Sequence, residues 1–185
     1  MTTKALTSKI FATCGTISAW TQALLHDVGI RSRVVSSLTL DSWNHYNDGH
    51  TLIEVYREYY KKWVVYDLDN NAYFARADCP LSFIEFSNHV ATGDYAIRRL
   101  ASDSGFDVSN FIDSDRQYDY AFAMEEIFAN EKSLRRWYAG VIHVPMIEDN
   151  GNYFFFDNVN RSRVETYSPR FRYMDKEQFM AKFEV

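Results

Sequence analysis

Cys14 stands where a helix is predicted to begin, which is a position that can make a thiol reactive. The apolar residues after it recur at helical intervals as far as Gly29, a common helix stop. A thiol in the first turn faces unpaired backbone N–H groups and the positive end of the helix dipole. Both favour the thiolate, the nucleophilic form of cysteine. Taken alone, however, a cysteine is more often a small buried residue.

Two further residues of catalytic type stand at the ends of predicted strands. Residues 29–40, 50–60 and 61–71 each have strand-like patterns, and the short link between the last two predicts an antiparallel hairpin. His50 begins the first strand of this hairpin and Asp67 lies near the end of the second. Since the start of one strand lies beside the end of the next, we expect these two side chains to be neighbours at one edge of the sheet.

Together the three residues would form a nucleophilic centre. If the helix packs across the sheet with its N-terminus at that edge, Cys14 meets His50. The centre would then hold a thiolate nucleophile, an imidazole base and a carboxylate that fixes the imidazole tautomer. Simpler interpretations exist, since His50 and Asp67 could both be ordinary turn residues. Asp69, two residues further on the same face, is the alternative orienting group.

The remaining sequence predicts one domain with an elaborated second half. With 185 residues, a single domain over 1–185 is expected. Its catalytic core would span 10–72, and 73–185 would form a helical and hairpin elaboration. The elements predicted there are short helices at 80–90 and 94–101, a longer helix at 118–138, a hairpin across 138–159 and a closing helix at 175–183.

Composition excludes several classes of function. The net charge of -5 is spread without a basic stripe, which argues against nucleic-acid binding. No window approaches the roughly 20 apolar residues of a membrane span, and the start does not have the pattern of a signal peptide. A soluble, cytoplasmic protein is therefore expected. Cys14 and Cys79 are too few for a disulfide framework, and neither has a Cys or His at short zinc-ligand spacing, so no metal or cofactor is expected.

Two short motifs carry a family resemblance. "GIRSRVV" at 29–35 follows fifteen residues after Cys14, and "WVVYD" at 63–67 follows the strand that His50 opens. In this order and spacing the sequence resembles the transglutaminase-like (papain-related) cysteine superfamily, including its bacterial members, over about 10–72. The resemblance implies an α+β fold whose catalytic helix packs on an antiparallel sheet. It also implies Cys14 as nucleophile, His50 as general base and Asp67 as orienting acid.

The sequence departs from this family at two points. Leu52 stands where many members have an aromatic residue two positions after the histidine, and only thirteen residues precede Cys14. An oxyanion-stabilising side chain that the family places upstream is therefore not identified. We expect the backbone N–H of Cys14 and a second, unidentified donor to take this role. Cys79 has no histidine at a matched element end and is expected to be an ordinary cysteine.

The resemblance implies acyl transfer on a peptide, amide or ester through a thioester of Cys14. Water as acceptor gives hydrolysis, which is the preferred outcome, and an amine gives transamidation. The alternative is a non-catalytic module on the same fold that binds peptide or saccharide through its many aromatic side chains. Trp43, His45 and Tyr46 immediately precede His50 and are expected to bind substrate at the mouth of the cleft. The oligomeric state does not follow from the sequence.

Overall fold

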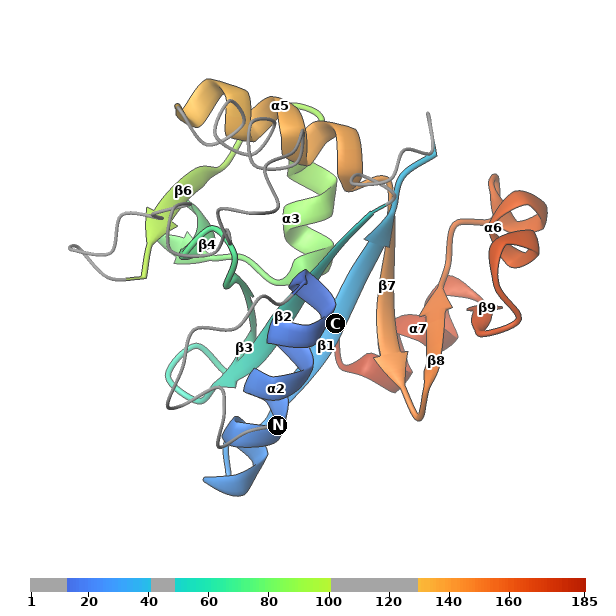
Figure 1. Cartoon of the computed structure of the whole chain (residues 1–185), viewed down its shortest axis with the longest axis horizontal. Helices are drawn as coiled ribbons and strands as arrows, with labels where there is room; N and C mark the ends of the chain where they lie inside the picture. The colour runs from blue at the N-terminus through green and yellow to red at the C-terminus, as the bar shows by residue number, and fades with distance from the viewer. Residues whose placement is uncertain (1–12, 41–48, 101–129) are drawn as a thin grey trace, which may run out of the picture.

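The computed structural model describes residues 13–40, 49–100 and 130–185, which form a nine-stranded sheet with helices on both faces (Figure 1). The strand order is β5-β4-β3-β2-β1-β7-β8-β9, with β6 also paired to β4. Every pairing is antiparallel except that of β8 with β9. The strands are β1 (Ser32–Leu38), β2 (Gly49–Arg57), β3 (Lys62–Asp67), β4 (Ala72–Arg76), β5 (Cys79–Pro80), β6 (Ala96–Arg99), β7 (Val144–Asp149), β8 (Asn152–Phe155) and β9 (Phe171–Tyr173).

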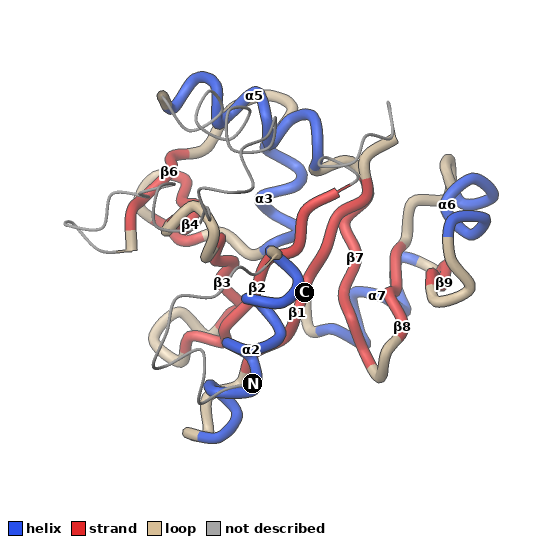
Figure 2. The backbone as a smooth tube through the Cα atoms, viewed as in Figure 1, coloured by secondary structure: helices blue, strands red, loops and turns tan. Residues whose placement is uncertain are grey.

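Five helices lie within the described residues, and the fold is therefore α+β, as expected. They are α2 (Cys14–Asp27), α3 (Phe83–Val90), α5 (Glu131–Val141), α6 (Arg161–Tyr167) and α7 (Lys176–Phe183). In Figure 2, α2 crosses the central strands β1 and β2. Helices α3 and α5 lie next to each other in the upper part of the view. None of the helices in the described ranges is long and apolar enough to cross a membrane.

The register of the central hairpin decides which side chains share a face. β2 pairs with β3 from Arg57 opposite Lys62 to Ile53 opposite Tyr66. Because side chains alternate along a strand, His50 and Leu52 point to the same face. Tyr66 lies opposite Ile53 and points to the other face, so Asp67, the next residue, points to the face of His50. The hairpin predicted from the sequence is thus confirmed, with His50 and Asp67 at one end of it.

The larger hydrophobic core covers the face that carries His50. Its sheet residues include Leu52 and Val65, and they pack against apolar side chains of three helices. From α3, α5 and α7 these are Phe83, Ile84, Phe86, Val90, Leu134, Tyr138, Val141, Phe179 and Phe183. Helices from the second half of the chain therefore cover this face of the strands that the first half supplies.

Helix α2 packs against β1 and β2 from the opposite face, and its first residue, Cys14, lies at the end of β2 where His50 and Thr51 stand (Figure 1). A Cβ on Gly15 would lie 3.8 Å from the Thr51 hydroxyl oxygen, in ordinary contact. The predicted helix is confirmed from Cys14 to Asp27, but its apolar residues are less buried than expected. Ser18 is the buried residue of α2, and Leu24 is 42% exposed among the described residues.

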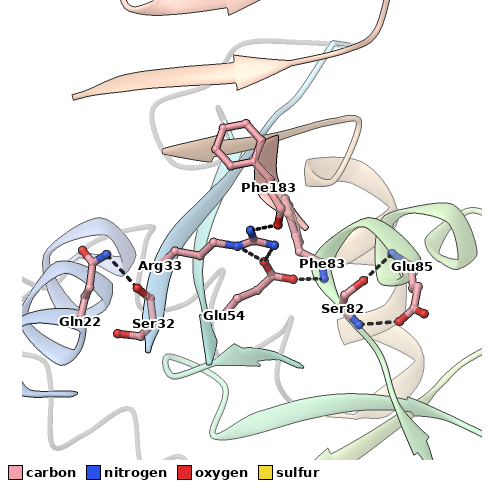
Figure 3. A network of polar contacts seen from close by, with 8 residues as sticks. All are labelled: Gln22, Ser32, Arg33, Glu54, Ser82, Phe83, Glu85 and Phe183. Atoms are coloured by element: carbon pink, nitrogen blue, oxygen red, sulfur yellow. Dashed lines mark hydrogen bonds and ion pairs between the residues drawn. The ribbon is translucent and has the colours of Figure 1, made fainter. Parts of the chain in front are cut away.

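A buried ion pair connects the sheet to the core helices (Figure 3). Arg33 of β1 donates from Nε to Glu54 Oε2 at 2.7 Å, and from Nη1 to the carbonyl of Phe183 at 2.5 Å. The other oxygen of Glu54 accepts from the backbone N–H of Phe83 at 2.6 Å. Both charges are removed from water, but each has several partners, as buried charges require. The network fixes α3 and the end of α7 relative to β1 and β2.

Most of the elements predicted in the second half are confirmed. The helix at 80–90 is α3, which begins with a capping box formed by Ser82 and Glu85. The hairpin at 138–159 is β7 and β8, and the closing helix is α7. The predicted helix at 118–138 is described only from residue 130, where Asn130 caps α5 and accepts from the Ser133 N–H. Its earlier part lies outside the described residues.

The helix predicted at 94–101 is wrong. Ala96–Arg99 is strand β6, which pairs antiparallel with β4, from Ala75 opposite Ala96 to Ala72 opposite Arg99. Local periodicity in so short a segment is weak, and hydrogen bonds to the available edge of β4 decide its conformation. The second half thus extends the sheet itself, since β4 and β6 lie beyond β3 and β7 pairs with β1.

Candidate active site

Cys14 is the first residue of α2, as the sequence predicted. Its N-cap, Thr13, makes no side-chain cap, and the first intrahelical bond from the helix start runs from the Ile17 N–H to the Thr13 carbonyl at 3.0 Å. The N–H groups of residues 14–16 therefore precede the helical hydrogen-bond ladder. Together with the helix dipole they provide positive potential at the thiol, which stabilises negative charge on or beside the sulfur.

His50 is placed by the glycine before it. Gly49 pairs with Leu38 of β1 and has φ +152°, which L side chains rarely adopt. A Cβ on Gly49 would lie 2.0 Å from the backbone carbonyl oxygen of Ser37. Only glycine lets β2 begin so close to β1. It thereby positions the imidazole of His50, which is 4% exposed.

Asp67 is the carboxylate that contacts His50. His50 Nε2 lies 2.8 Å from Asp67 Oδ2, and both side chains are almost completely buried. This contact follows from the hairpin register, which puts the two residues on one face at the same end of the strands. Since Nε2 donates to Asp67, Nδ1 is the ring nitrogen left to face Cys14.

The Asp67 carboxylate has further donors that hold it in its ionised form. Asn70 donates from its backbone N–H to Oδ1 at 3.1 Å and from Nδ2 to Oδ2 at 2.6 Å. The Tyr138 hydroxyl donates to Oδ2 at 2.6 Å. Burial alone would raise the pKa of Asp67, but the charge of His50 and these hydrogen bonds lower it below its usual value.

The thiol and the imidazole alter each other's proton affinity. Burial would lower the pKa of His50, but the Asp67 carboxylate and the interaction with Cys14 raise it well above its ordinary value. Burial would raise the pKa of Cys14, but His50 and a hydrogen bond from the Thr51 backbone lower it. Both shifts favour a thiolate beside an imidazolium, which is a pair with a nucleophile and a proton donor in contact.

Asp69 lies at the same site without binding His50 as Asp67 does. One donor atom each of Cys14, His50 and Asp69 lie within 4.8 Å of one another. Burial and the charge of Asp67 raise the pKa of Asp69 to about 7, against the opposing effect of His50. Its Oδ1 atom is buried and has no hydrogen-bond partner among the described residues. The geometry therefore favours Asp67 over Asp69 as the group that orients the imidazole.

Helix α5 supplies two residues of the site that sequence reasoning missed. The Trp137 ring lies edge-on to the His50 ring, with centroids 4.7 Å apart at 69°. Tyr138 is fully buried and donates to Asp67, 71 positions earlier in the chain. Burial and the nearby Asp67 charge raise the pKa of Tyr138 well above its ordinary value, so its hydroxyl remains a donor. In the sequence these two residues stood only at the end of the helix predicted over 118–138.

The three residues predicted to bind substrate, Trp43, His45 and Tyr46, lie outside the described residues. Cys79 is a free, exposed cysteine in the short edge strand β5. Of the two cysteines, Cys14 is therefore the one that the fold places beside an imidazole and a carboxylate.

Comparison with known proteins identifies the same stretch of the chain. The family model of the transglutaminase-like superfamily matches residues 2–68, which confirms the resemblance expected from the sequence. This stretch contains Cys14, His50 and Asp67, and it ends before Asp69 and well before α5. The superfamily generally contains cysteine hydrolases or acyltransferases, which indicates cysteine-dependent catalysis. No curated protein and no solved structure matches the chain.

Proposed function

We propose that this protein catalyses cysteine-dependent acyl transfer on an amide or ester, with Cys14 as nucleophile, His50 as general base and acid, and Asp67 as orienting group. The support is a chain of contacts from three separate elements. The thiol at the start of α2 interacts with the imidazole at the start of β2, which bonds to the carboxylate at the end of β3. We further propose that these elements form a papain-like core.

The first half of the reaction would form a thioester. The Cys14 thiolate attacks the carbonyl carbon, and the resulting oxyanion accepts hydrogen bonds from N–H groups at the start of α2. As this intermediate collapses, the His50 imidazolium donates its proton to the leaving amine or alcohol. Asp67 holds the ring in the orientation that this transfer needs.

The second half would release the acyl group. His50, now neutral, takes a proton from the acceptor as the acceptor attacks the thioester carbonyl. The bond from the sulfur to the carbonyl carbon then breaks, and Cys14 leaves as thiolate beside the imidazolium. We propose water as the acceptor, which makes the reaction a hydrolysis of a peptide, amide or ester. An amine acceptor would use the same groups and give transamidation.

Intact-mass spectrometry of the protein treated with a panel of activated amides and esters tests the covalent step. We expect one acyl adduct per chain, at Cys14. It should be lost in Cys14→Ala and retained in Cys79→Ala, the matched control. Adduct formation at Cys79 instead, or at neither cysteine while Cys14 also resists iodoacetamide, would favour a non-catalytic binding module and contradict the proposal.

A competing nucleophile identifies the acceptor. With an ester that forms the adduct, hydrolysis predicts that the acid accumulates even when a primary amine is added at millimolar concentration. If the amide formed with the added amine dominates, transamidation is the reaction, and water is kept from the thioester.

A further inference from the structure

The donor atoms at the active site also have the composition of a zinc site. A thiol sulfur from α2, an imidazole nitrogen from β2 and a carboxylate oxygen from the turn after β3 lie within 4.8 Å of one another. Among the described residues, Cys14, His50 and Asp69 form the only such group of three. Sulfur, nitrogen and oxygen donors of these types are the ligands that Zn²⁺ takes in proteins, with three protein ligands and an open fourth position in catalytic sites.

Asp69 has a carboxylate oxygen ready to act as a ligand. Its Oδ1 atom is buried without a hydrogen-bond partner in the described part of the chain. A buried carboxylate oxygen without a partner is unfavourable, and a bound cation would compensate it. Asp67 differs, because its two oxygens already accept bonds from His50, Asn70 and Tyr138. Of the two carboxylates, only Asp69 has an oxygen left for a metal.

The imidazole is already oriented as a metal ligand would be. In zinc sites the ligating histidine usually donates its other ring N–H to a carboxylate, which fixes the tautomer and the ring plane. Here His50 Nε2 lies 2.8 Å from Asp67, and Asp67 is held in turn by Tyr138 and Asn70. This leaves Nδ1 of His50 for coordination, on the side where Cys14 lies.

We propose that Cys14, His50 and Asp69 bind a zinc ion reversibly, and that the bound ion switches off the nucleophile. Tetrahedral Zn²⁺ with bonds of about 2.0–2.3 Å needs donors about 3.3–3.8 Å apart, so small rotations of the Cys14 and Asp69 side chains complete the site. Bonds form from zinc to sulfur, nitrogen and oxygen, while water leaves the ion. The proton shared by the thiol and the imidazole passes to solvent.

Loss of activity is the expected consequence, because the sulfur that would attack substrate is bonded to the ion. This consequence rests on the proposed function, but the metal binding itself does not. It can therefore be measured on the intact protein without any substrate.

Cobalt titration of the chelator-treated, reduced protein tests the binding directly, since Co²⁺ replaces zinc and its bond to a thiolate absorbs in the near ultraviolet. We expect one Co²⁺ per chain, a thiolate-to-cobalt band, and its loss when Zn²⁺ is added. The band should disappear in Cys14→Ser. In Asp69→Asn the affinity for cobalt should fall at least tenfold, because losing a ligand should cost no less than losing a residue that only orients one.

Two matched variants serve as controls. Cys79→Ser removes the exposed cysteine, and Asp78→Asn removes an exposed aspartate that pairs with Arg98. Both variants should therefore bind cobalt like the unchanged protein. A band that survives in Cys14→Ser but vanishes in Cys79→Ser would overturn the proposal. So would unchanged affinity in an Asp69→Asn protein that folds, as judged by circular dichroism.

Alkylation connects the binding to the nucleophile. Saturating Zn²⁺ should slow the reaction of iodoacetamide with Cys14 at least tenfold and leave Cys79 unaffected. Equal rates with and without zinc would overturn the inhibitory role. If cobalt binds at Cys14 but no acyl adduct ever forms, the proposed function fails alone, whereas adduct formation without metal binding contradicts this inference alone.

Discussion

Two regions of the molecule contribute to the candidate site in different ways. The stretch that matches the superfamily model, residues 2–68, supplies Cys14, His50 and Asp67. Helix α5, far outside the match, supplies Trp137 against the His50 ring and Tyr138 as a donor to Asp67. The first region holds every group proposed to touch the reacting atoms, and the second holds groups that act through them.

This difference separates what the chemistry needs from what holds it in place. A thiolate, an imidazole and a carboxylate in sequence order can be recognised as motifs, because the reaction restricts their types. The side chains that bury and orient them have only to fit, so another protein can use different ones. The comparison predicts large effects on activity in the matched region and smaller effects in α5.

The largest effect is expected at the orienting carboxylate. Asp67→Asn keeps the shape but not the charge, so the imidazole can take the wrong tautomer, and kcat should fall by a factor of about 10⁴. Asp69→Asn, the matched control two residues away, should lower kcat far less. The measurement is steady-state hydrolysis of the best substrate from the adduct panel. A larger loss in Asp69→Asn than in Asp67→Asn would reverse the assignment.

Just beyond the matched region, Asp69 should show a stability penalty instead. Its pKa is raised to about 7, whereas an unfolded aspartate ionises near 3.9. Between these values the folded protein binds a proton that the unfolded chain has lost, so stability falls as the pH rises. Asp69→Asn removes this penalty and should raise the free energy of unfolding by about 4 kcal/mol at pH 7.5.

Urea unfolding at pH 7.5 and pH 4 measures this gain. At pH 4 it should fall below about 1 kcal/mol, because Asp69 is then neutral in the folded protein and about half protonated in the unfolded chain. Asp78→Asn, on the exposed surface, should change stability little at either pH. A gain of the same size at both pH values would mean that the charge of Asp69 is not its cause.

A moderate effect is expected on the reactivity of the thiol. The interaction with His50 lowers the pKa of Cys14, so His50→Ala should slow iodoacetamide labelling of Cys14 near pH 7. The largest expected loss is about 30-fold, which is the ratio between a thiol that is fully ionised and an ordinary cysteine at this pH. Peptide mapping after timed alkylation gives the rate, and Cys79 in the same protein is the internal control. Equal labelling rates of Cys14 in His50→Ala and in the unchanged protein would mean that the imidazole does not activate the thiol.

The smallest effect is expected in α5. Tyr138→Phe removes one hydrogen bond of 2.6 Å to the Asp67 carboxylate, and kcat should fall about tenfold while KM stays unchanged. Tyr95→Phe is the matched control, because Tyr95 is a buried tyrosine of the same core whose hydroxyl is not bonded to Asp67. A loss in Tyr138→Phe as large as that in Asp67→Asn would remove the distinction between the two regions.

Local patterns in the sequence predicted much of the first half of the chain. Helical spacing and a glycine stop located α2, and alternation and a short link located the β2–β3 hairpin. That His50 lies beside the end of β3 follows from these elements, because antiparallel pairing brings the ends of adjacent strands together.

Other features could not be predicted, because they depend on which elements meet. Ala96–Arg99 became a strand through pairing with β4, against its predicted helix. Short zinc-ligand spacing does not occur around either cysteine, yet the fold brings Cys14, His50 and Asp69 together from three elements.

The sequence by itself determined the types of the reacting residues and the helix and strand ends at which they stand, since both are encoded by neighbours along the chain. Only the tertiary structure decided that Asp67 rather than Asp69 bonds to His50, and that Tyr138 and Trp137 complete its surroundings. These contacts join residues as many as 71 positions apart. Packing of the core selects these contacts, and no local sequence pattern predicts them.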